Sequence, residues 1–460
     1  MPAEVPSSHQ VLPSGEVLPS DEDGFVRGLS ELGGGPAGRH ARPSPPRRAL
    51  AVVLLLTAVT CLLGWVQKSP CRTHPWTHEY QYTRMCYSDT FALYYAEKLA
   101  DGKTPYVDTP VEYPVLLGAA MGVTAKVVAW TPVGGRGQRY FDLNALLLTA
   151  AAMVVAAMTW ALAGRRRPWD AALFAAAPVL VFNAFTNWDL IAAALAAAGL
   201  WAWARRRPIL AGVLVGIGTA TKLYPALLLL PLLALCLRER QLREWFRAAA
   251  AAVIAWLIID VPVWLTYPRN FGRFWSLNRN RGADWNSIWL ALEHARGRPL
   301  DPAGAVPPDR LNLAFAAATL LVILGVIALA LLAPRRPRVA SLAFLLVAGF
   351  LLVNKVASPQ YVLWVLPLAV LARPRWGALL AWQATEIVTL FFLYYYFVAN
   401  AHPGSGIAVE WYLTALLVRD AALIGLMALV GWEIWQPDRD VVRRSGVDDP
   451  AGGVLVRATG

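Results

Sequence analysis

Long apolar segments recur between residues 49 and 435, and they constrain the fold more than any other feature of this sequence. A helix that spans a bilayer needs about 20 apolar residues, and hydrophobic residues make up 57% of the chain. Charged residues make up only 16%, against about 25% in soluble proteins. The sequence therefore predicts an all-α polytopic membrane protein. It excludes a soluble enzyme and a single-pass receptor.

Short arginine clusters follow several of these segments and predict how the helices are oriented. The clusters lie at 165–167, 205–207, 238–247, 335–338 and 373–375. Because arginine and lysine concentrate in cytoplasmic loops, we expect all of these clusters in the cytoplasm, with an even number of crossings between them. This count predicts about twelve transmembrane helices, with both termini on the cytoplasmic side of a cell membrane. It also accounts for the net charge of +12 without a nucleic-acid partner.

The same count requires one apolar segment not to cross. If residues 113–130 spanned the membrane, every later arginine cluster would lie outside. We therefore expect this segment to enter the membrane from outside and return, or to lie on the membrane surface as a helix. Two large extracytoplasmic loops result, at about 66–139 and about 268–310.

The ends of the chain differ from its centre. Residues 1–48 are rich in proline, glycine and serine, which is typical of disorder. We expect residues 1–48 and 436–460 to be disordered cytoplasmic tails, on either side of a transmembrane domain at 49–435.

Ionisable residues that the orientation rule does not explain collect at the predicted outer ends of helices. A charge at the bilayer centre costs about 2.5 to 3.5 kcal/mol, so such residues need a function. Carboxylates mixed with cations are typical of a site for an anionic amphiphile, because a phosphate needs arginine or lysine and an attacking hydroxyl needs a base. The group includes Asp89, Glu112, Asp189, Lys222, Arg279, Arg281, Lys355 and His402.

Structural interpretations of these residues remain open at this point. Asp89 follows Ser88 at the start of a helical segment, so it is equally consistent with a helix N-cap. Lys222 is also consistent with a lysine that extends to the membrane interface. Arg279 and Arg281 are also consistent with solvated loop charges.

Several motifs resemble those of the polytopic glycosyltransferases of the GT-C fold. They are Asp89 with Gly102-Lys103-Thr104-Pro105-Tyr106 and Glu112-Tyr113-Pro114, then Asn187-Trp188-Asp189, Gly218 to Lys222 with Tyr224-Pro225, and Lys355 with Ser358-Pro359-Gln360-Tyr361 and Trp364. The resemblance is closest to glycosyltransferase family 87, the actinobacterial mannosyltransferases that use a polyprenyl-phosphate sugar, and it runs from about residue 49 to 433. Val115 departs from the pattern, since the family commonly has a second proline there.

The resemblance implies an inverting single displacement with Asp89 as general base. Asp89 would deprotonate an acceptor hydroxyl, which attacks the anomeric carbon of a hexose, with mannose expected, as polyprenyl phosphate leaves. The acceptor would be an extracytoplasmic glycolipid or glycan. The expected phosphate contacts are Lys355 first, then Arg279 and Arg281, with Lys222 and His402 as further candidates. The expected acceptor contacts or cavity lining are Glu112, Tyr113, Asn187, Asp189, Tyr224, Gln360, Tyr361 and Trp285.

No metal or other cofactor is expected. Asp-x-Asp pairs, which hold a divalent ion in nucleotide-sugar enzymes, occur only at 21/23 and 438/440, both in the predicted cytoplasmic tails. The donor would therefore be a lipid phosphate. The main alternative is a transporter or flippase of a lipid-linked sugar, which predicts charges near the bilayer midplane and inverted repeats. The sequence does not indicate an oligomeric state.

Two of the four cysteines, Cys71 and Cys86, fall in the first predicted outer loop. A disulfide between them would stabilise the segment that leads to Asp89 by about 3 kcal/mol, and free thiols remain the alternative. Cys61 and Cys236 lie in apolar segments and are expected to be packing residues.

Overall fold

The computed structural model describes residues 16–34, 46–74, 76 and 78–456, and regular structure in this part of the chain is helical. Six of its helices are long and apolar enough to cross a membrane. They are α3 (Pro46–Gln67), α8 (Arg136–Ala163), α14 (Leu242–Thr266), α17 (Asp309–Leu332), α20 (Trp376–Ala401) and α21 (Val409–Trp435). The all-α polytopic architecture expected from the sequence is therefore observed.

Shorter apolar helices fill the space between the long ones. They are α7 (Val115–Ala129), α10 (Pro178–Asn183), α11 (Asp189–Ala204), α12 (Pro208–Thr219), η2 (Tyr224–Leu228) with α13 (Leu229–Arg238), α18 (Val339–Val353), and η3 (Pro359–Tyr361) with α19 (Val362–Ala372). Helices α18 and α19 are almost entirely buried, whereas α17 is the least buried of the long helices. Twelve crossings remain a prediction, because the shorter helices are below the length of a full span.

Close backbone packing joins α12 to α14. A Cβ atom at Gly212 would lie 2.0 Å from the carbonyl oxygen of Ala248, and one at Gly216 would lie 2.2 Å from that of Ala252. These two glycines are spaced as in the small-residue motif that lets membrane helices approach closely. Pairing of this kind keeps α12 beside α14 and so fixes the start of the η2 segment that follows it.

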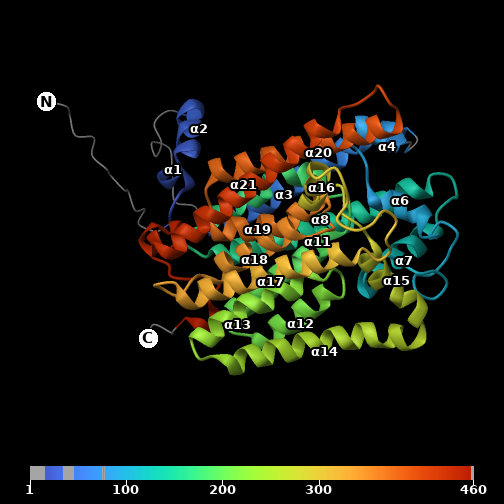
Figure 1. Ribbon diagram of the computed structural model, residues 1–460. Helices are drawn as coiled ribbons and strands as arrows, with labels where there is room; N and C mark the ends of the chain where they lie inside the picture. The colour runs from blue at the N-terminus through green and yellow to red at the C-terminus, as the bar shows by residue number, and fades with distance from the viewer. Residues whose placement is uncertain (1–15, 35–45, 75, 77, 457–460) are drawn as a thin grey trace.

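All five arginine clusters lie at one end of the bundle, together with the helical segment that follows α21 (Figure 1). Arg206 donates to the carbonyl of Val456 and Arg238 to that of Ala330. Arg373 pairs with Glu433 at 2.8 Å. Their shared position agrees with the even number of crossings that the sequence predicts between clusters.

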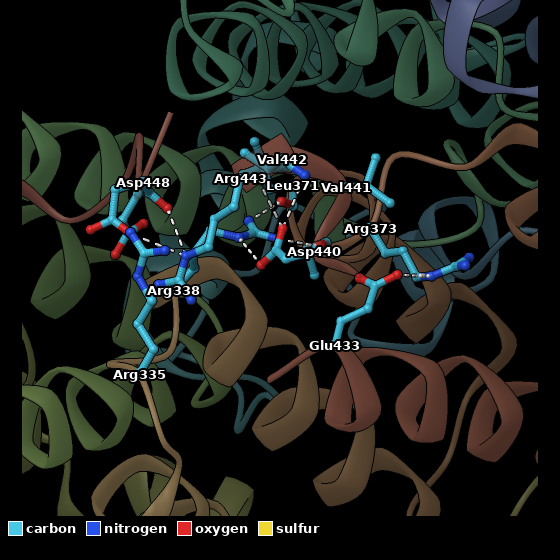
Figure 2. A network of polar contacts seen from close by, with 12 residues as sticks. Arg335, Arg338, Leu371, Arg373, Glu433, Asp440, Val441, Val442, Arg443 and Asp448 are labelled. Carbon is cyan, nitrogen blue, oxygen red and sulfur yellow. Dashed lines mark hydrogen bonds and ion pairs between the residues drawn. The ribbon is translucent and has the colours of Figure 1, made fainter. Parts of the chain in front are cut away.

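The segment after α21 is folded against this end of the bundle. It contains η4 (Pro437–Arg439), α22 (Val441–Arg444) and η5 (Gly453–Leu455). Figure 2 shows Asp440 meeting the buried guanidinium of Arg338, and the two groups lie 2.8 Å apart. Asp448 in turn pairs with Arg335 at 2.9 Å and with Arg443 at 3.0 Å. The prediction that residues 436–460 are disordered is therefore wrong for residues 436–456, and residues 457–460 lie outside the described residues.

The N-terminal segment is folded as well, in α1 (Pro19–Glu22) and α2 (Gly24–Gly34). Glu22 pairs with Arg167 at 2.7 Å, and Asp23 accepts a hydrogen bond from the backbone N–H of Trp376 at 2.8 Å. The prediction of disorder at 1–48 is thus wrong for the described part of this segment. Residues 1–15 and 35–45 lie outside the described residues.

The two predicted outer loops meet at the opposite end of the bundle (Figure 1). They contain α4 (Ser69–Thr73), α5 (His78–Thr83), α6 (Asp89–Ala96), α7, α15 (Pro268–Asn280) and α16 (Ile288–Ala295). Both ends of α7 are at this end, because Tyr113 lies beside Asp89 in a cavity and Ala129 accepts a hydrogen bond from Arg136 at the start of α8. This placement agrees with the expectation that 113–130 does not cross.

Candidate functional site

A cavity of about 660 Å³ opens at the loop end of the bundle. Its walls come from the start of α6, the start of α7, the turn between α10 and α11, η2, the end of α15 and the link between α18 and α19. The sequence-predicted residues that line it are Asp89, Glu112, Tyr113, Asn187, Lys222, Tyr224, Arg281, Trp285, Lys355, Gln360 and Tyr361. Segments far apart in the sequence therefore supply one polar site.

The start of α6 directs Asp89 into this cavity. Ser88, and not Asp89, is the N-cap of the helix: its side chain accepts from the backbone N–H of Thr90 at 3.3 Å. The Ser88 hydroxyl also donates to the carbonyl of Phe185 at 2.6 Å, and the backbone N–H of Asp89 donates to that of Thr186 at 2.7 Å. Since Ser88 satisfies the helix terminus, the carboxylate of Asp89 is not needed as a cap.

Three side chains donate to the carboxylate of Asp89. The Tyr87 hydroxyl donates to Oδ1 at 2.6 Å, and the amides of Asn187 and Gln360 donate to Oδ2 at 2.7 Å and 3.3 Å. Burial raises the pKa of Asp89, while the hydrogen bonds from Tyr87 and Asn187 and the charge of Lys222 act in the opposite direction. A carboxylate has about four acceptor positions, so one remains for a further donor.

Lys222 lies next to this carboxylate within a buried network. Its ammonium is 3.2 Å from Oδ1 of Asp189 and donates to Oδ1 of Asn187 at 3.1 Å. The indole N–H of Trp364 also donates to Asp189, at 2.7 Å. The rings of Tyr113 and Tyr361 face the same ammonium, with centroids at 4.9 Å and 5.6 Å. Because its charge is matched by Asp189, Lys222 positions Asn187 rather than presenting a free cation to the cavity.

The two other cations of the cavity differ in how their charges are used. The ammonium of Lys355 donates to the carbonyls of Arg281 and Arg279 at 2.7 Å and 3.3 Å, and to the side chain of Asn312 at 2.5 Å. These contacts use its three donors, and burial lowers its pKa to about 8. The guanidinium of Arg281 lines the cavity, and within the described residues it makes no hydrogen bond or ion pair. Arg281 is therefore the cation best placed to meet an anionic ligand.

Glu112 and the aromatic residues form the rest of the lining. Burial raises the pKa of Glu112, followed by the charge of Asp89. The ring of Trp364 stacks between two tyrosines, with centroid distances of 4.3 Å to Tyr224 and 4.0 Å to Tyr361. This stack forms a rigid wall next to Asp89.

Three predicted site residues do not reach the cavity. Asp189 is fully buried behind it and acts through Lys222 and Trp364. Arg279 does not line the cavity, and only its backbone carbonyl contacts a lining residue, by accepting a hydrogen bond from Lys355. His402 lies at the end of α20 and contacts Glu79, away from the cavity.

The predicted cysteine pair supports the segment before Asp89. Cys71 and Cys86 are joined by a disulfide, with their Cα atoms 5.8 Å apart, whereas Cys61 and Cys236 are free and buried. The bridge holds the chain next to Tyr87, one residue before the N-cap of α6.

Sequence reasoning missed two residues that hold Asp89 in place, Tyr87 and Lys68. Buried Lys68 donates to the carbonyl of Tyr87 at 2.9 Å, and Tyr87 donates to Asp89. Burial lowers the pKa of Lys68 to about 7. The sequence offered one signal, the adjacency of Tyr87 to Asp89; nothing in it brings Lys68 to this loop.

Among the described residues, no group of three or more histidine, cysteine, aspartate or glutamate side chains is placed to hold a metal ion. The cavity offers three carboxyl groups, those of Asp89, Glu112 and Asp284, together with amides, cations and aromatic rings. The carboxyl groups and amides suit a neutral polyol, and the cations suit an anion joined to it.

Comparison with known proteins identifies the family of the central part of the chain. Residues 141–359 match the family model described as Glycosyltransferase family 87. The match includes Asn187, Lys222, Arg281 and Lys355; it begins after Asp89 and ends one residue before Gln360. No curated protein matches the chain.

Proposed function

Because its family 87 domain and its apolar helices make this chain a membrane glycosyltransferase, we propose that it transfers a hexose from a polyprenyl phosphate to a hydroxyl of a glycolipid or glycan. Mannose is the hexose that we propose. The observation that carries the proposal is that the carboxylate of Asp89 and the guanidinium of Arg281 line one cavity. A base and an anion-binding cation are the two groups that such a transfer needs.

In the proposed reaction, Asp89 accepts the proton of the acceptor hydroxyl. The hydroxyl oxygen forms a bond to the anomeric carbon, and the bond from that carbon to the phosphate oxygen breaks. The bonding electrons leave with polyprenyl phosphate, which needs no proton. One displacement inverts the anomeric configuration, so a single carboxylate base is sufficient, unlike the carboxylate pair of a retaining hydrolase.

The leaving phosphate gains negative charge as the bond breaks, and Arg281 is our first candidate to stabilise it. A guanidinium can form two parallel hydrogen bonds to phosphate oxygens. Lys355 lies next to Arg281 and holds its backbone carbonyl at 2.7 Å. Lys355 therefore shapes the phosphate site, and its charge adds to the field there.

The apolar side of the cavity suits the lipid part of the donor. Phe315 of α17 and Phe350 of α18 line it, with ring centroids 6.1 Å apart. Helix α17 is largely exposed on the outside of the bundle, where lipid would lie. A polyprenyl chain could thus leave the cavity into the bilayer beside α17. We further propose that the cavity faces the extracytoplasmic side, because the arginine clusters lie at the other end of the bundle.

A transfer assay in proteoliposomes tests the proposal. The protein is supplied with radiolabelled polyprenyl-phosphate mannose and with membrane glycolipid extract from a strain that lacks it. We expect labelled product, and we expect Arg281→Gln to lower kcat/KM at least tenfold while Arg298→Gln, on the exposed part of the same outer loop, leaves it unchanged. Absence of product with the unmutated protein would refute transfer. Movement of the labelled donor between leaflets without product would favour the flippase alternative.

A further inference from the structure

A second hollow lies beside the reaction cavity, at the same end of the bundle. We call it the aromatic groove; its volume is about 570 Å³ and it is lined by Tyr82, Trp285, Tyr396, Phe397, Asn400 and Ala401. Tyr82 belongs to α5, residues 396–401 end α20, and Trp285 lies in the link between α15 and α16. None of these residues carries a charge. The groove is therefore unsuited to a phosphate and suited to a neutral ligand.

The aromatic groove adjoins the reaction cavity. Trp285 lines both hollows. Tyr82 also packs on Tyr87, with ring centroids 5.8 Å apart, and the Tyr87 hydroxyl donates to Asp89 at 2.6 Å. A ligand in the groove would thus lie beside the tyrosines that lead to Asp89.

Packing fixes the rings of the groove in place. Tyr396 stacks on Tyr412 at 5.3 Å, and the Tyr412 hydroxyl donates to the backbone carbonyl of Trp285 at 2.5 Å. Phe397 lies edge-on to Trp285 at 5.5 Å and to Tyr82 at 5.2 Å. A preformed aromatic surface loses little conformational freedom when a ligand binds.

Several polar atoms of the groove have no hydrogen-bond partner within the described residues. Within the described part of the chain, no hydrogen bond involves the hydroxyl of Tyr82, the hydroxyl of Tyr396 or the indole N–H of Trp285, and the Trp285 residue is 46% exposed. The amide of Asn400 is exposed at the rim. Apolar ring faces next to unused donors and acceptors match a sugar unit, which has an apolar face of C–H groups and a rim of hydroxyls.

We propose that the aromatic groove binds the sugar units of the acceptor that do not react, and that the acceptor is a neutral oligosaccharide chain. This inference rests on the proposed function, which brings the reacting hydroxyl to Asp89. The donor phosphate is expected at Arg281, which lines the reaction cavity and is not among the residues that line the groove. A phospholipid headgroup is disfavoured as the occupant because no cation is among the described residues that line the groove.

Binding of sugar oligomers to the purified full-length protein in nanodiscs tests the inference. The probes are linear manno- and gluco-oligosaccharides of one to six units, measured by saturation-transfer difference NMR without donor. We expect affinity to rise with length in at least one series. Tyr396→Ala should lower the affinity for the hexasaccharide about five- to tenfold and leave the weak binding of the monosaccharide unchanged.

Two further variants keep the test independent of folding. Tyr395→Ala removes the neighbouring tyrosine of α20, which packs on Phe391 at 4.5 Å outside the groove, and it should leave oligosaccharide affinity unchanged. Asn400→Ala changes only an exposed rim residue and should lower hexasaccharide affinity about two- to threefold. Affinity that does not depend on length in either series, or equal effects of Tyr396→Ala and Tyr395→Ala, would overturn the inference.

The same samples separate this inference from the proposed function. Length-dependent binding that requires Tyr396, in a protein that transfers no sugar, would refute transfer and leave the groove standing. Sugar transfer whose acceptor KM is the same for short and long chains and for Tyr396→Ala would refute the groove and leave transfer standing.

Discussion

Replacing Lys222 by methionine tests the buried network behind Asp89. Asp189 is fully buried, and its carboxylate has two partners, the ammonium of Lys222 at 3.2 Å and the indole N–H of Trp364 at 2.7 Å. Within the described residues, its second oxygen has no hydrogen bond. Removing one partner of a buried ion pair costs about 3 to 5 kcal/mol. We expect Lys222→Met to lower the free energy of unfolding by that amount.

A double variant provides the control for this prediction. In Lys222→Met/Asp189→Asn no charge is left unpaired, and the amide oxygen can still accept from Trp364. We therefore expect the double variant to lose only about 1 to 2 kcal/mol. Unfolding in mixed micelles, followed by tryptophan fluorescence against the mole fraction of a denaturing detergent, measures both values. A single variant that loses less than about 1 kcal/mol, or a double variant as unstable as the sum of the two single ones, would refute the reasoning.

Three further predictions follow from the described contacts. Replacing Cys71 and Cys86 by serine should lower the free energy of unfolding by about 3 kcal/mol, which thermal denaturation with and without reductant measures; an unchanged melting temperature would contradict it. Asp440→Ala should lower the free energy of unfolding by about 3 to 5 kcal/mol, because it leaves the guanidinium of Arg338 buried without its ion-pair partner (Figure 2). An unchanged free energy of unfolding in the denaturing-detergent titration would contradict this prediction. Because burial raises the pKa of Asp89 and the base must be deprotonated, kcat/KM should rise with pH through a value above the ordinary carboxyl pKa of about 4 and then level off; a pH–rate profile without this acid limb would oppose the assignment.

The helical framework could be predicted because apolar length alone identifies membrane helices. The breaks near Thr221–Pro225 and Asn354–Gln360 were also predictable, since polar and proline residues interrupt the apolar runs there. Between the arginine cluster at 165–167 and the turn after Asn183, the apolar chain forms three short pieces, η1 (Pro168–Ala171), α9 (Ala172–Ala175) and α10. Pro178 begins the last piece, and a proline lacks the N–H that would continue the previous one.

The folded ends of the chain could not be predicted from local composition. Proline, glycine and charge are typical of disorder when no partner is near. Here the partners are distant in sequence: Glu22 meets Arg167, and Asp440 meets Arg338. Such pairings arise only once the bundle has brought the helix ends together.

In the candidate site, the sequence predicted which residues gather and not what each contacts. Ser88 caps α6, so the N-cap interpretation of Asp89 is wrong. Lys222 forms an ion pair with Asp189, and Lys355 donates hydrogen bonds to backbone carbonyls at the end of α15. Arg281 is therefore the cation whose charged group is open to the cavity. Charge type can be read from sequence, whereas pairing depends on three-dimensional neighbours.

The rate of sugar transfer by Asp89→Asn tests the central claim most directly. Asparagine keeps the size of the side chain and its acceptor oxygen toward Tyr87, but it cannot take up the proton. The matched control is Asp101→Asn, an exposed acid of the same outer loop. We predict that Asp89→Asn lowers kcat at least 100-fold with little change in the donor KM, while Asp101→Asn behaves as the unmutated protein. Transfer by Asp89→Asn within a few-fold of the unmutated rate would contradict the account.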